Sequence, residues 1–159
     1  MAEPLNTHVY IFADGSATGT GIGAWASLVV VPATGVSKLL YGLSGTTTIN
    51  RCELQPIVEA LRWVNRNLSR GLRVRVVSDS QQTARIMGGE FDPKNNLDLW
   101  AAYAHEASSQ SIRAVWQERN SHPYMNLVDA VAYSLRKSVK PMADKLDKTE
   151  IKEVDVTNL

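Results

Sequence analysis

Short apolar runs divide the first third of the chain into strands separated by polar, glycine-containing segments. Three runs are predicted to be strands: Val9–Ala13, Ile22–Val31 and Val36–Leu43. The segment Pro32–Gly35 contains the Pro and Gly that favour a chain reversal, so the second and third strands should form a hairpin. Gly15–Gly21 is expected to be a turn, which would leave Asp14 at the end of the first strand.

The apolar spacing then changes to a helical period, and the helix is expected to start near Asn50 and to end before Gly71. Its apolar positions follow the i, i+3, i+4, i+7 pattern: Leu54, Ile57, Val58 and Leu61. The same criteria predict a strand at Leu72–Ser78, a helix from Ser80 to about Met87, a helix at Leu97–Ala107, a strand at Ile112–Glu118 and a helix at Met125–Val139. This order indicates a mixed α/β sheet.

The chain shows no internal repeat and no boundary before residue 140, so residues 1–140 are expected to form one domain. Residues 141–159 alternate charges, carry few large apolar side chains, and are net acidic. We expect this segment to be a mobile tail, because it cannot bury enough apolar surface to order itself. A docking role for its last residues, Val156–Leu159, is the alternative.

Composition fits a cytoplasmic globular protein. The chain has 159 residues and is 44% hydrophobic, which is enough for a core. Its longest apolar runs, such as Leu28–Val31, are too short to span a bilayer, and Met1–Pro4 lacks the features of a secretion signal. The single cysteine, Cys52, cannot form an internal disulfide, so a reducing compartment is expected.

The net charge of +1 averages two unlike parts. Residues 1–140 contain 14 Lys and Arg against 11 Asp and Glu, whereas residues 141–159 contain 3 against 5. If four of the acids in the first part were neutralised by bound metal, its net charge would be +7 (14 minus 7). A body that basic would attract phosphate groups.

Four acids beside or within apolar patterns are the candidate catalytic residues: Asp14, Glu53, Asp79 and Asp129. A carboxylate at the end of a buried element is costly unless a cation compensates it. Carboxylate oxygens are the ligands that Mg²⁺ prefers, and two such ions about 4 Å apart promote phosphodiester cleavage. For any single acid, a helix cap or a surface charge is the alternative, and spacing alone does not show that the four converge.

Several motifs together resemble type 1 ribonuclease H. They are Ile11–Ser16, Thr47–Leu54, Val77–Gln81, Asn96–Trp100, and His122-Pro123 followed by Asp129-Ala130. The match runs in the family order over residues 8–138. It implies a ribonuclease H-like α/β fold with a five-stranded mixed sheet flanked by helices. It also implies an endonuclease that hydrolyses the RNA strand of RNA–DNA hybrids.

The resemblance assigns residues to roles at this site. Asp14, Glu53, Asp79 and Asp129 would be the catalytic set and would bind two ions, Mg²⁺ or alternatively Mn²⁺. Asn50 and Gln81 match family positions in the minor groove of the hybrid, where the ribose 2′-hydroxyl distinguishes RNA from DNA. The backbone at Gly15 and Ser16 would also approach the RNA strand, because glycine leaves room there.

Two departures from the family pattern concern substrate and catalysis. The interval Gly88–Asn95 is too short to hold the basic, Trp-rich protrusion of many bacterial members. Arg119 occupies the place of the usual catalytic-loop histidine and is assigned to substrate binding. His122 is the possible auxiliary residue, as a stand-in for that histidine or as an anchor of its turn.

Two other functions stay open. One is a nuclease-fold module without turnover that binds nucleic acid or protein, although a binder has no need for buried carboxylates. The other is a related DNA-cleaving nuclease, and fold alone does not separate it from a hybrid-cleaving enzyme. No obligate protein partner and no membrane are expected, and the protein is expected to be a monomer.

Overall fold

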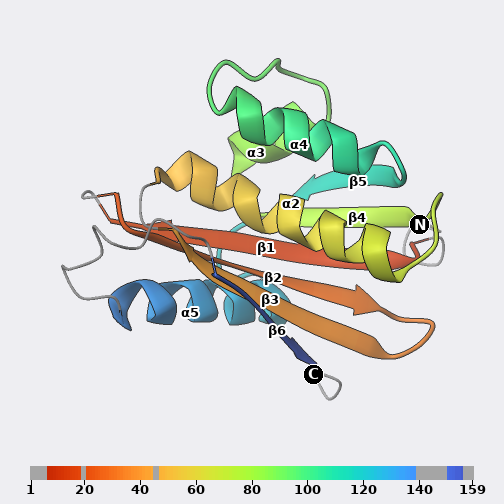
Figure 1. The fold of residues 1–159 in the computed structure, drawn as a ribbon, viewed down its shortest axis with the longest axis horizontal. Helices are drawn as coiled ribbons and strands as arrows, with labels where there is room; N and C mark the ends of the chain where they lie inside the picture. The colour runs from red at the N-terminus through yellow and green to blue at the C-terminus, as the bar shows by residue number, and fades with distance from the viewer. Residues whose placement is uncertain (1–6, 19–20, 45–46, 139–149, 156–159) are drawn as a thin grey trace.

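The computed structural model describes residues 7–18, 21–44, 47–138 and 150–155. Its centre is a six-stranded sheet with the strand order β5-β4-β1-β2-β3-β6 (Figure 1). The strands are β1 (Val9–Ala17), β2 (Gly23–Val31), β3 (Val36–Ser44), β4 (Arg73–Ser78), β5 (Ser111–Trp116) and β6 (Glu150–Asp155). β1, β4 and β5 are parallel, whereas β1, β2, β3 and β6 form successive antiparallel pairs.

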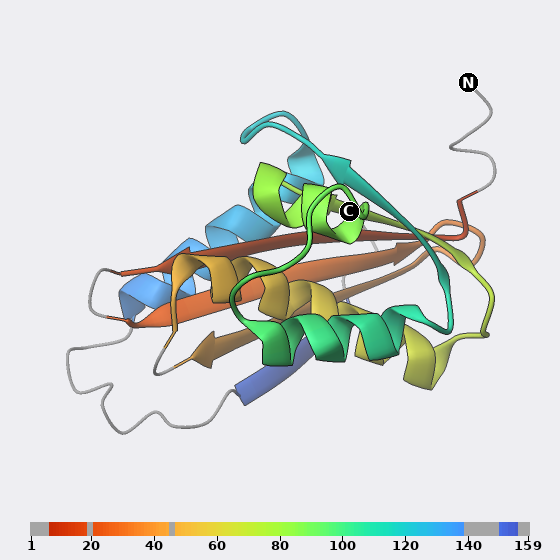
Figure 2. The ribbon, with the colours of Figure 1, turned by 90° about the horizontal axis from the view of Figure 1, so that it is seen from above.

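Helices cover both faces of the sheet. Helix α2 (Ile49–Asn67) lies on one face with α4 (Leu97–Ala107) beside it, and α5 (Pro123–Ser138) lies on the other (Figures 1 and 2). The short helix α3 (Gln81–Met87) follows directly after β4. Within the residues that the structure describes, no helix has both the length and the apolar character needed to cross a bilayer.

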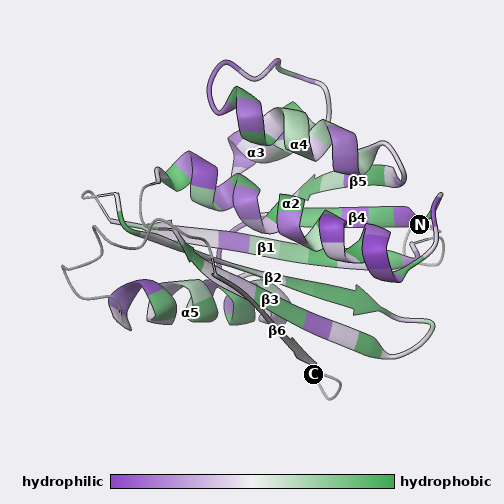
Figure 3. Ribbon diagram, viewed as in Figure 1, coloured by the Kyte–Doolittle hydropathy of each residue, from purple (hydrophilic) through white to green (hydrophobic). Residues whose placement is uncertain are grey.

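The alternation of side chains along β1 divides the core into two parts. Ile11 and Ala13 pack in the cluster under α2, while Phe12 packs in the cluster under α5. Figure 3 shows β2 as mostly hydrophobic, whereas hydrophilic and hydrophobic residues alternate along α2. By the same alternation, Asp14 and Ser16 share the α5 side of β1 with Phe12.

The expected five-stranded mixed sheet is confirmed by β1 to β5, and β6 extends it. The expectation of a mobile tail is therefore wrong for residues 150–155, which pair with β3 from Lys38 to Leu43. The physical reason is that the outer edge of β3 would otherwise present a row of unpaired N–H and C=O groups, which a passing segment can satisfy. Residues 141–149 and 156–159, including the proposed docking segment, lie outside the described residues.

The first strand is also longer than expected. We expected it to end at Asp14, but β1 continues through Gly15 and Ser16 to Ala17 because these residues pair with Gly23–Trp25 of β2. The pairing with β4 stops earlier, at Ala13 and Ser78. Asp14 therefore lies inside the sheet, at the point where β1 loses its neighbour on one side.

Candidate active site

Three carboxylates from three separate elements meet where β1 and β4 diverge. Asp14 lies in β1, Glu53 lies in the second turn of α2, and Asp79 directly follows β4. One ligand oxygen from each lies within 4.8 Å of the other two. Asp14 and Glu53 are buried, at 0% and 6% exposure, so the cluster is set into the protein and not spread over its surface.

Close packing of α2 against β1 brings Glu53 to Asp14. Gly15 is buried, and a Cβ atom at that position would overlap the carbonyl group of Cys52. Pro56 has no N–H to donate to that carbonyl within the helix, so the Cys52 oxygen is left to face the strand. A side chain at Gly23 would likewise overlap Cys52 and Thr47. Two glycines therefore let the start of α2 lie directly on the sheet.

Gly15 also fixes the orientation of its neighbour. Its backbone N–H donates a 2.9 Å hydrogen bond to Oδ1 of Asp14. The space that Gly15 leaves is occupied by Cys52 of α2, whereas the sequence suggested that this space would admit the RNA strand. The glycine is thus needed here to assemble the carboxylates.

Asp79 is held by the junction between β4 and α3. Ser80 caps α3 by accepting a 3.2 Å hydrogen bond from the backbone N–H of Thr83, and its own N–H donates to Oγ of Ser78. The indole Nε1 of Trp116 donates a 3.1 Å hydrogen bond to the carbonyl oxygen of Asp79. These contacts fix the backbone at Asp79 from both β4 and β5.

The pKa values and the unsatisfied oxygens of the clustered carboxyl groups indicate a binding site for a cation. Burial, followed by the charges of Asp79 and Asp129, raises the pKa of Asp14 from 3.8 to about 8. Burial and the charges of Asp14 and Asp79 also raise the pKa of Glu53 well above its ordinary value. Oδ2 of Asp14 and Oε2 of Glu53 are buried with no hydrogen-bond partner. An all-oxygen set with unsatisfied buried atoms fits a hard divalent metal ion.

Asp129 lies beside this group but is not part of the compact set of three. It comes from α5, on the opposite face of the sheet from α2. The nearness of its carboxyl group to Asp14 is one of the causes of the raised pKa of Asp14. The structure thus brings all four predicted acids to one place, three of them in mutual ligand range and Asp129 at the margin, next to Asp14.

Arg119 and His122 lie on the loop before α5 and differ in their surroundings. Nε of Arg119 lies 3.5 Å from Oδ2 of Asp79, and the Arg119 side chain is 64% exposed. The His122 ring stacks on Phe12 with centroids 5.0 Å apart, and its Nδ1 accepts a 3.1 Å hydrogen bond from the N–H of Tyr124. Arg119 therefore reaches the carboxylates from solvent, while His122 is packed into the start of α5.

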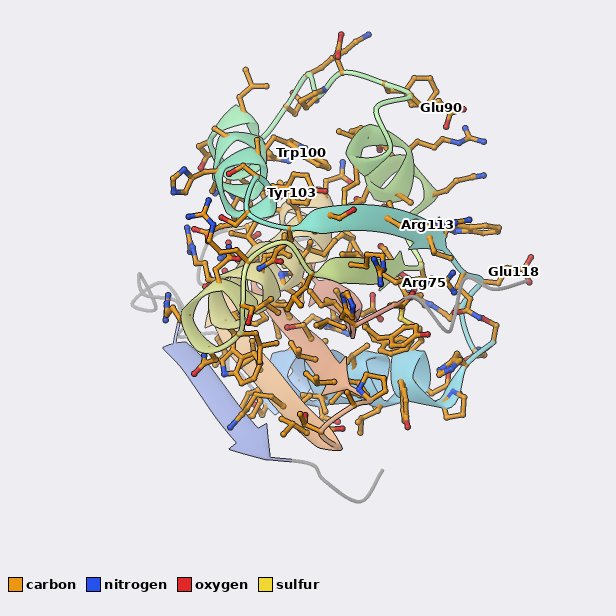
Figure 4. All side chains as sticks on the ribbon, turned by 90° about the vertical axis from the view of Figure 1, so that its right-hand side faces the viewer. Arg75, Glu90, Trp100, Tyr103, Arg113 and Glu118 are labelled. Atoms are coloured by element: carbon orange, nitrogen blue, oxygen red, sulfur yellow. The ribbon has the colours of Figure 1, made fainter. Side chains whose placement is uncertain are left out.

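The remaining predicted residues flank the carboxylates. Asn50 and Gln81 are exposed in the first turns of α2 and α3. Asn50 lines a groove of about 460 Å³ between α2, α3 and α4, together with Trp100. Figure 4 shows Trp100 directed from α4 toward α3. Ser16 accepts a 2.6 Å hydrogen bond from Nε of Arg136.

One structural support of the site was missed in the sequence. Arg51, two residues before Glu53, forms a bidentate pair with Asp98, with N–O distances of 2.8 and 2.9 Å. The pair ties the start of α2 to the start of α4. Both residues occur in the motifs that suggested the family, but no spacing rule connects positions 47 residues apart.

Comparison with known proteins agrees with this arrangement. The RNase H family model matches residues 6–140. A ribonuclease H from Campylobacter jejuni is 30% identical over 131 residues, which cover 79% of this chain and 88% of that protein. A ribonuclease H from Cupriavidus metallidurans is 33% identical over 139 residues, which cover 78% of this chain and 92% of that protein.

Solved structures show the same fold. The N-terminal RNase H domain of a Mycobacterium tuberculosis protein, solved as a fusion with maltose-binding protein, superposes with a TM-score of 0.73 at 21% identity, covering 82% of this chain and 94% of that chain. LC11-RNase H1, in complex with an RNA/DNA hybrid, superposes with a TM-score of 0.68 at 20% identity, covering 83% and 99%. With the family model matched over most of its length, this chain belongs to the ribonuclease H family.

Proposed function

We propose that this protein is a metal-dependent endoribonuclease that hydrolyses the RNA strand of RNA–DNA hybrids. The observation that carries the proposal is the convergence of three carboxylates, two of them deeply buried, with ligand atoms within 4.8 Å of one another. The family is metal-dependent and binds such hybrids, and its match spans residues 6–140. A module that only bound nucleic acid would gain nothing from burying these charges.

The roles that we assign to the four acids follow from their positions. Asp14, Glu53 and Asp79 would hold Mg²⁺, or alternatively Mn²⁺, with Asp129 completing a site for two ions. Two such ions activate a water molecule and stabilise the leaving oxygen in phosphodiester hydrolysis. The buried face of the cluster excludes water on one side, so the strand to be cut has to approach from the side of Asp79 and Arg119.

Arg119 occupies the position of the usual catalytic-loop histidine, and we assign it to substrate binding and not to proton transfer. Its guanidinium stays protonated at any working pH, so it cannot transfer a proton. In the structure it is paired with Asp79 and largely exposed. We propose that it exchanges this carboxylate for a substrate phosphate, while His122 anchors the turn before α5.

We assign the recognition of RNA to polar side chains around the carboxylate cluster. Asn50 and Gln81 are exposed on the two helices that flank the carboxylates, where they can donate to or accept from a 2′-hydroxyl. Ser16 lies on the other side of Asp14, at the end of β1. We propose that these residues make the enzyme selective for the hybrid over a DNA duplex, acting as a cytoplasmic monomer without an obligate protein partner.

The test is cleavage of one labelled sequence prepared as RNA–DNA hybrid, duplex DNA and duplex RNA, each with Mg²⁺ and with EDTA. The proposal predicts cutting of the hybrid RNA strand in Mg²⁺ and none in EDTA, with the DNA duplex intact. Comparable cutting of duplex DNA would move the protein to the DNA-cleaving nucleases. Tight binding of the hybrid without cleavage in Mg²⁺ or Mn²⁺ would identify a binding module.

A further inference from the structure

The last turns of α5 carry a second group of side chains that reaches the same strand as the carboxylates. Nε of Arg136 donates the 2.6 Å hydrogen bond to Ser16. The ring of Tyr133, which is 47% exposed, has the Arg136 guanidinium 5.2 Å and the Lys137 ammonium 5.3 Å from its centroid. These four residues, Ser16, Tyr133, Arg136 and Lys137, form the α5 cationic cluster.

The α5 cationic cluster lies farther along β1 and α5, the two elements that carry Asp14 and Asp129. Ser16 lies two residues beyond Asp14 on the same side of β1, which is about 6.6 Å along a strand. Arg136 lies seven residues beyond Asp129 on α5, which is two helical turns or about 10.5 Å on the same helix face. Asp129 lies near enough to Asp14 to raise its pKa, and Arg136 donates a hydrogen bond to Ser16. The two pairs are therefore neighbouring links between β1 and α5.

The chemistry of the cluster suits an anion. Among the described residues, no carboxylate forms a salt bridge with Arg136 or Lys137. A guanidinium that donates through Nε keeps further donors at its two Nη atoms, and a serine hydroxyl that accepts a hydrogen bond still has its own proton to donate. Fixed donors with positive charge and no competing acid favour phosphate.

We propose that the α5 cationic cluster binds a phosphate of the RNA strand next to the one that is cut. This rests on the proposed function and adds a positioning site to it. The cluster lies one link away from the carboxylates, and the DNA strand of an A-like duplex lies across a wide minor groove, so the phosphate belongs to the strand being cleaved. Arg136 holds the strand in register, and Lys137 adds charge.

The first test compares Arg136→Ala with a matched control, Arg70→Ala. Arg70 is an exposed arginine three residues after the end of α2. The C-terminal ends of α2 and α5 lie at opposite ends of the molecule (Figure 1). For Arg136→Ala we expect KM for a short hybrid to rise roughly tenfold, kcat to stay within about threefold, and the slope of log affinity against log salt to fall by about 1. Arg70→Ala should change none of the three by more than about twofold.

The second test maps the contact and does not depend on turnover. Hybrids with one neutral methylphosphonate linkage, placed in turn at each RNA position, are titrated by fluorescence anisotropy in EDTA. The wild-type protein should lose about tenfold in affinity at one linkage near the cleavage position, and Arg136→Ala should be insensitive to that same linkage. A penalty at that linkage equal in both proteins, or one confined to the DNA strand, would overturn the proposal.

A purely structural role for Arg136 is separated by two further measurements. Arg136→Lys keeps the charge and should restore the salt slope, although the geometry at Ser16 is lost. If Arg136→Ala lowers only the Tm and leaves KM and the salt slope unchanged, the contact merely ties α5 to β1 and the subsite does not exist. If the wild-type protein loses affinity at one RNA linkage as expected but does not cut the hybrid, the proposed function is wrong and the phosphate-binding role of the α5 cationic cluster is supported.

Discussion

At the scale of single residues, ionisation of the acids at the site is unfavourable, because two of them are buried and three of them lie close to one another. Asp14 and Glu53 are buried with unsatisfied oxygens. Burial is the main cause of the raised pKa of each group; the charge of Asp14 adds to the shift of Glu53, and the charge of Asp79 adds to both shifts. Such an arrangement destabilises the metal-free fold when the groups ionise, and binding of a divalent cation reverses this cost. The residues that form the site are therefore a source of instability until metal is bound.

This predicts an unusual pH dependence for the metal-free protein. The pKa of Asp14 is about 8 in the folded state against 3.8 as its ordinary value, so the folded protein binds more protons than the unfolded chain between these values. Stability from this group is complete below the lower value and is lost as the pH rises toward the upper one. In EDTA, the Tm should be higher at about pH 5 than at about pH 8 by roughly 3–10 °C.

The neutral variant Asp14→Asn tests the cause of that dependence. It should raise the Tm of the metal-free protein at about pH 8, flatten its pH profile and abolish cleavage. Asp98→Asn is the control, because Asp98 is exposed and its pKa is lowered to about 2 by the hydrogen bond from Arg51, so it should not raise the Tm. A Tm for Asp14→Asn below that of the wild type at this pH would contradict the account.

The loop before α5 gives a second prediction at this scale. His122→Ala should reduce turnover by less than about tenfold, because a true general acid–base group is typically worth about 10²–10⁴-fold. Arg119→Ala should mainly raise KM, since its guanidinium cannot carry a proton. Steady-state kinetics on a hybrid separates the two effects, and a hundredfold loss of kcat in His122→Ala alone would show that this histidine takes part in proton transfer.

At the scale of elements, the docking of α2 on β1 decides whether the carboxylates meet. The contact consists of Gly15 and Gly23 on the sheet and Cys52 on the helix, with Pro56 leaving the Cys52 carbonyl without a helical donor. Glu53 is the next residue after Cys52. Any displacement of the helix start is therefore passed directly to a proposed metal ligand.

Gly15→Ala should accordingly affect both stability and activity. The added methyl group overlaps the Cys52 backbone, and overpacking of this kind costs about 1–3 kcal/mol. We expect a lower Tm and a loss of metal-dependent stabilisation as well as of cleavage. Gly88→Ala is the matched control. The added Cβ atom would lie 3.4 Å from its nearest neighbour, the carbonyl oxygen of Ala84, and the backbone at Gly88 is in the right-handed helical region. Equal effects of the two substitutions would contradict this role of Gly15.

Sequence patterns predicted the elements well and their ends less well. The hairpin and the helical period around Leu54 and Leu61 depend on local periodicity, and both are confirmed. The extension of β1 past Asp14 was not predictable, because Gly15 in a strand is stabilised by its partner in β2 and not by its own preference. The pairs Arg51–Asp98 and Arg136–Ser16 also depend on tertiary structure, and no local pattern encodes them.

At the scale of the whole molecule, the site and the added strand lie in different parts of the sheet. The carboxylates gather around β1 and β4, whereas β6 pairs with β3 at the far edge of the order β5-β4-β1-β2-β3-β6. Charge and composition predicted an acidic tail, but an open strand edge is a property of the assembled sheet and is not visible in the tail itself. Residues 150–155 therefore extend the sheet at an edge away from the carboxylates.

Truncation after Lys140 should separate stability from chemistry. Removing β6 exposes the edge of β3, so the Tm should fall and self-association should increase. Turnover measured well below the new Tm should stay within about twofold of the full chain, and hybrid binding should improve slightly because negative charge is lost. Thermal unfolding, light scattering and kinetics on the same preparation check this, and a collapse of kcat in a folded truncation would place the tail in the catalytic machinery.

Asp79→Asn tests whether the converging carboxylates form a metal centre that cuts RNA. The substitution is nearly isosteric and removes one charge from the group whose ligand atoms lie within 4.8 Å of one another. The measurement is the rate of RNA-strand cleavage in a hybrid at saturating Mg²⁺, with folding checked by circular dichroism. We expect a folded protein with cleavage reduced at least about 10³-fold. Cleavage by the folded variant at a near wild-type rate would contradict this expectation.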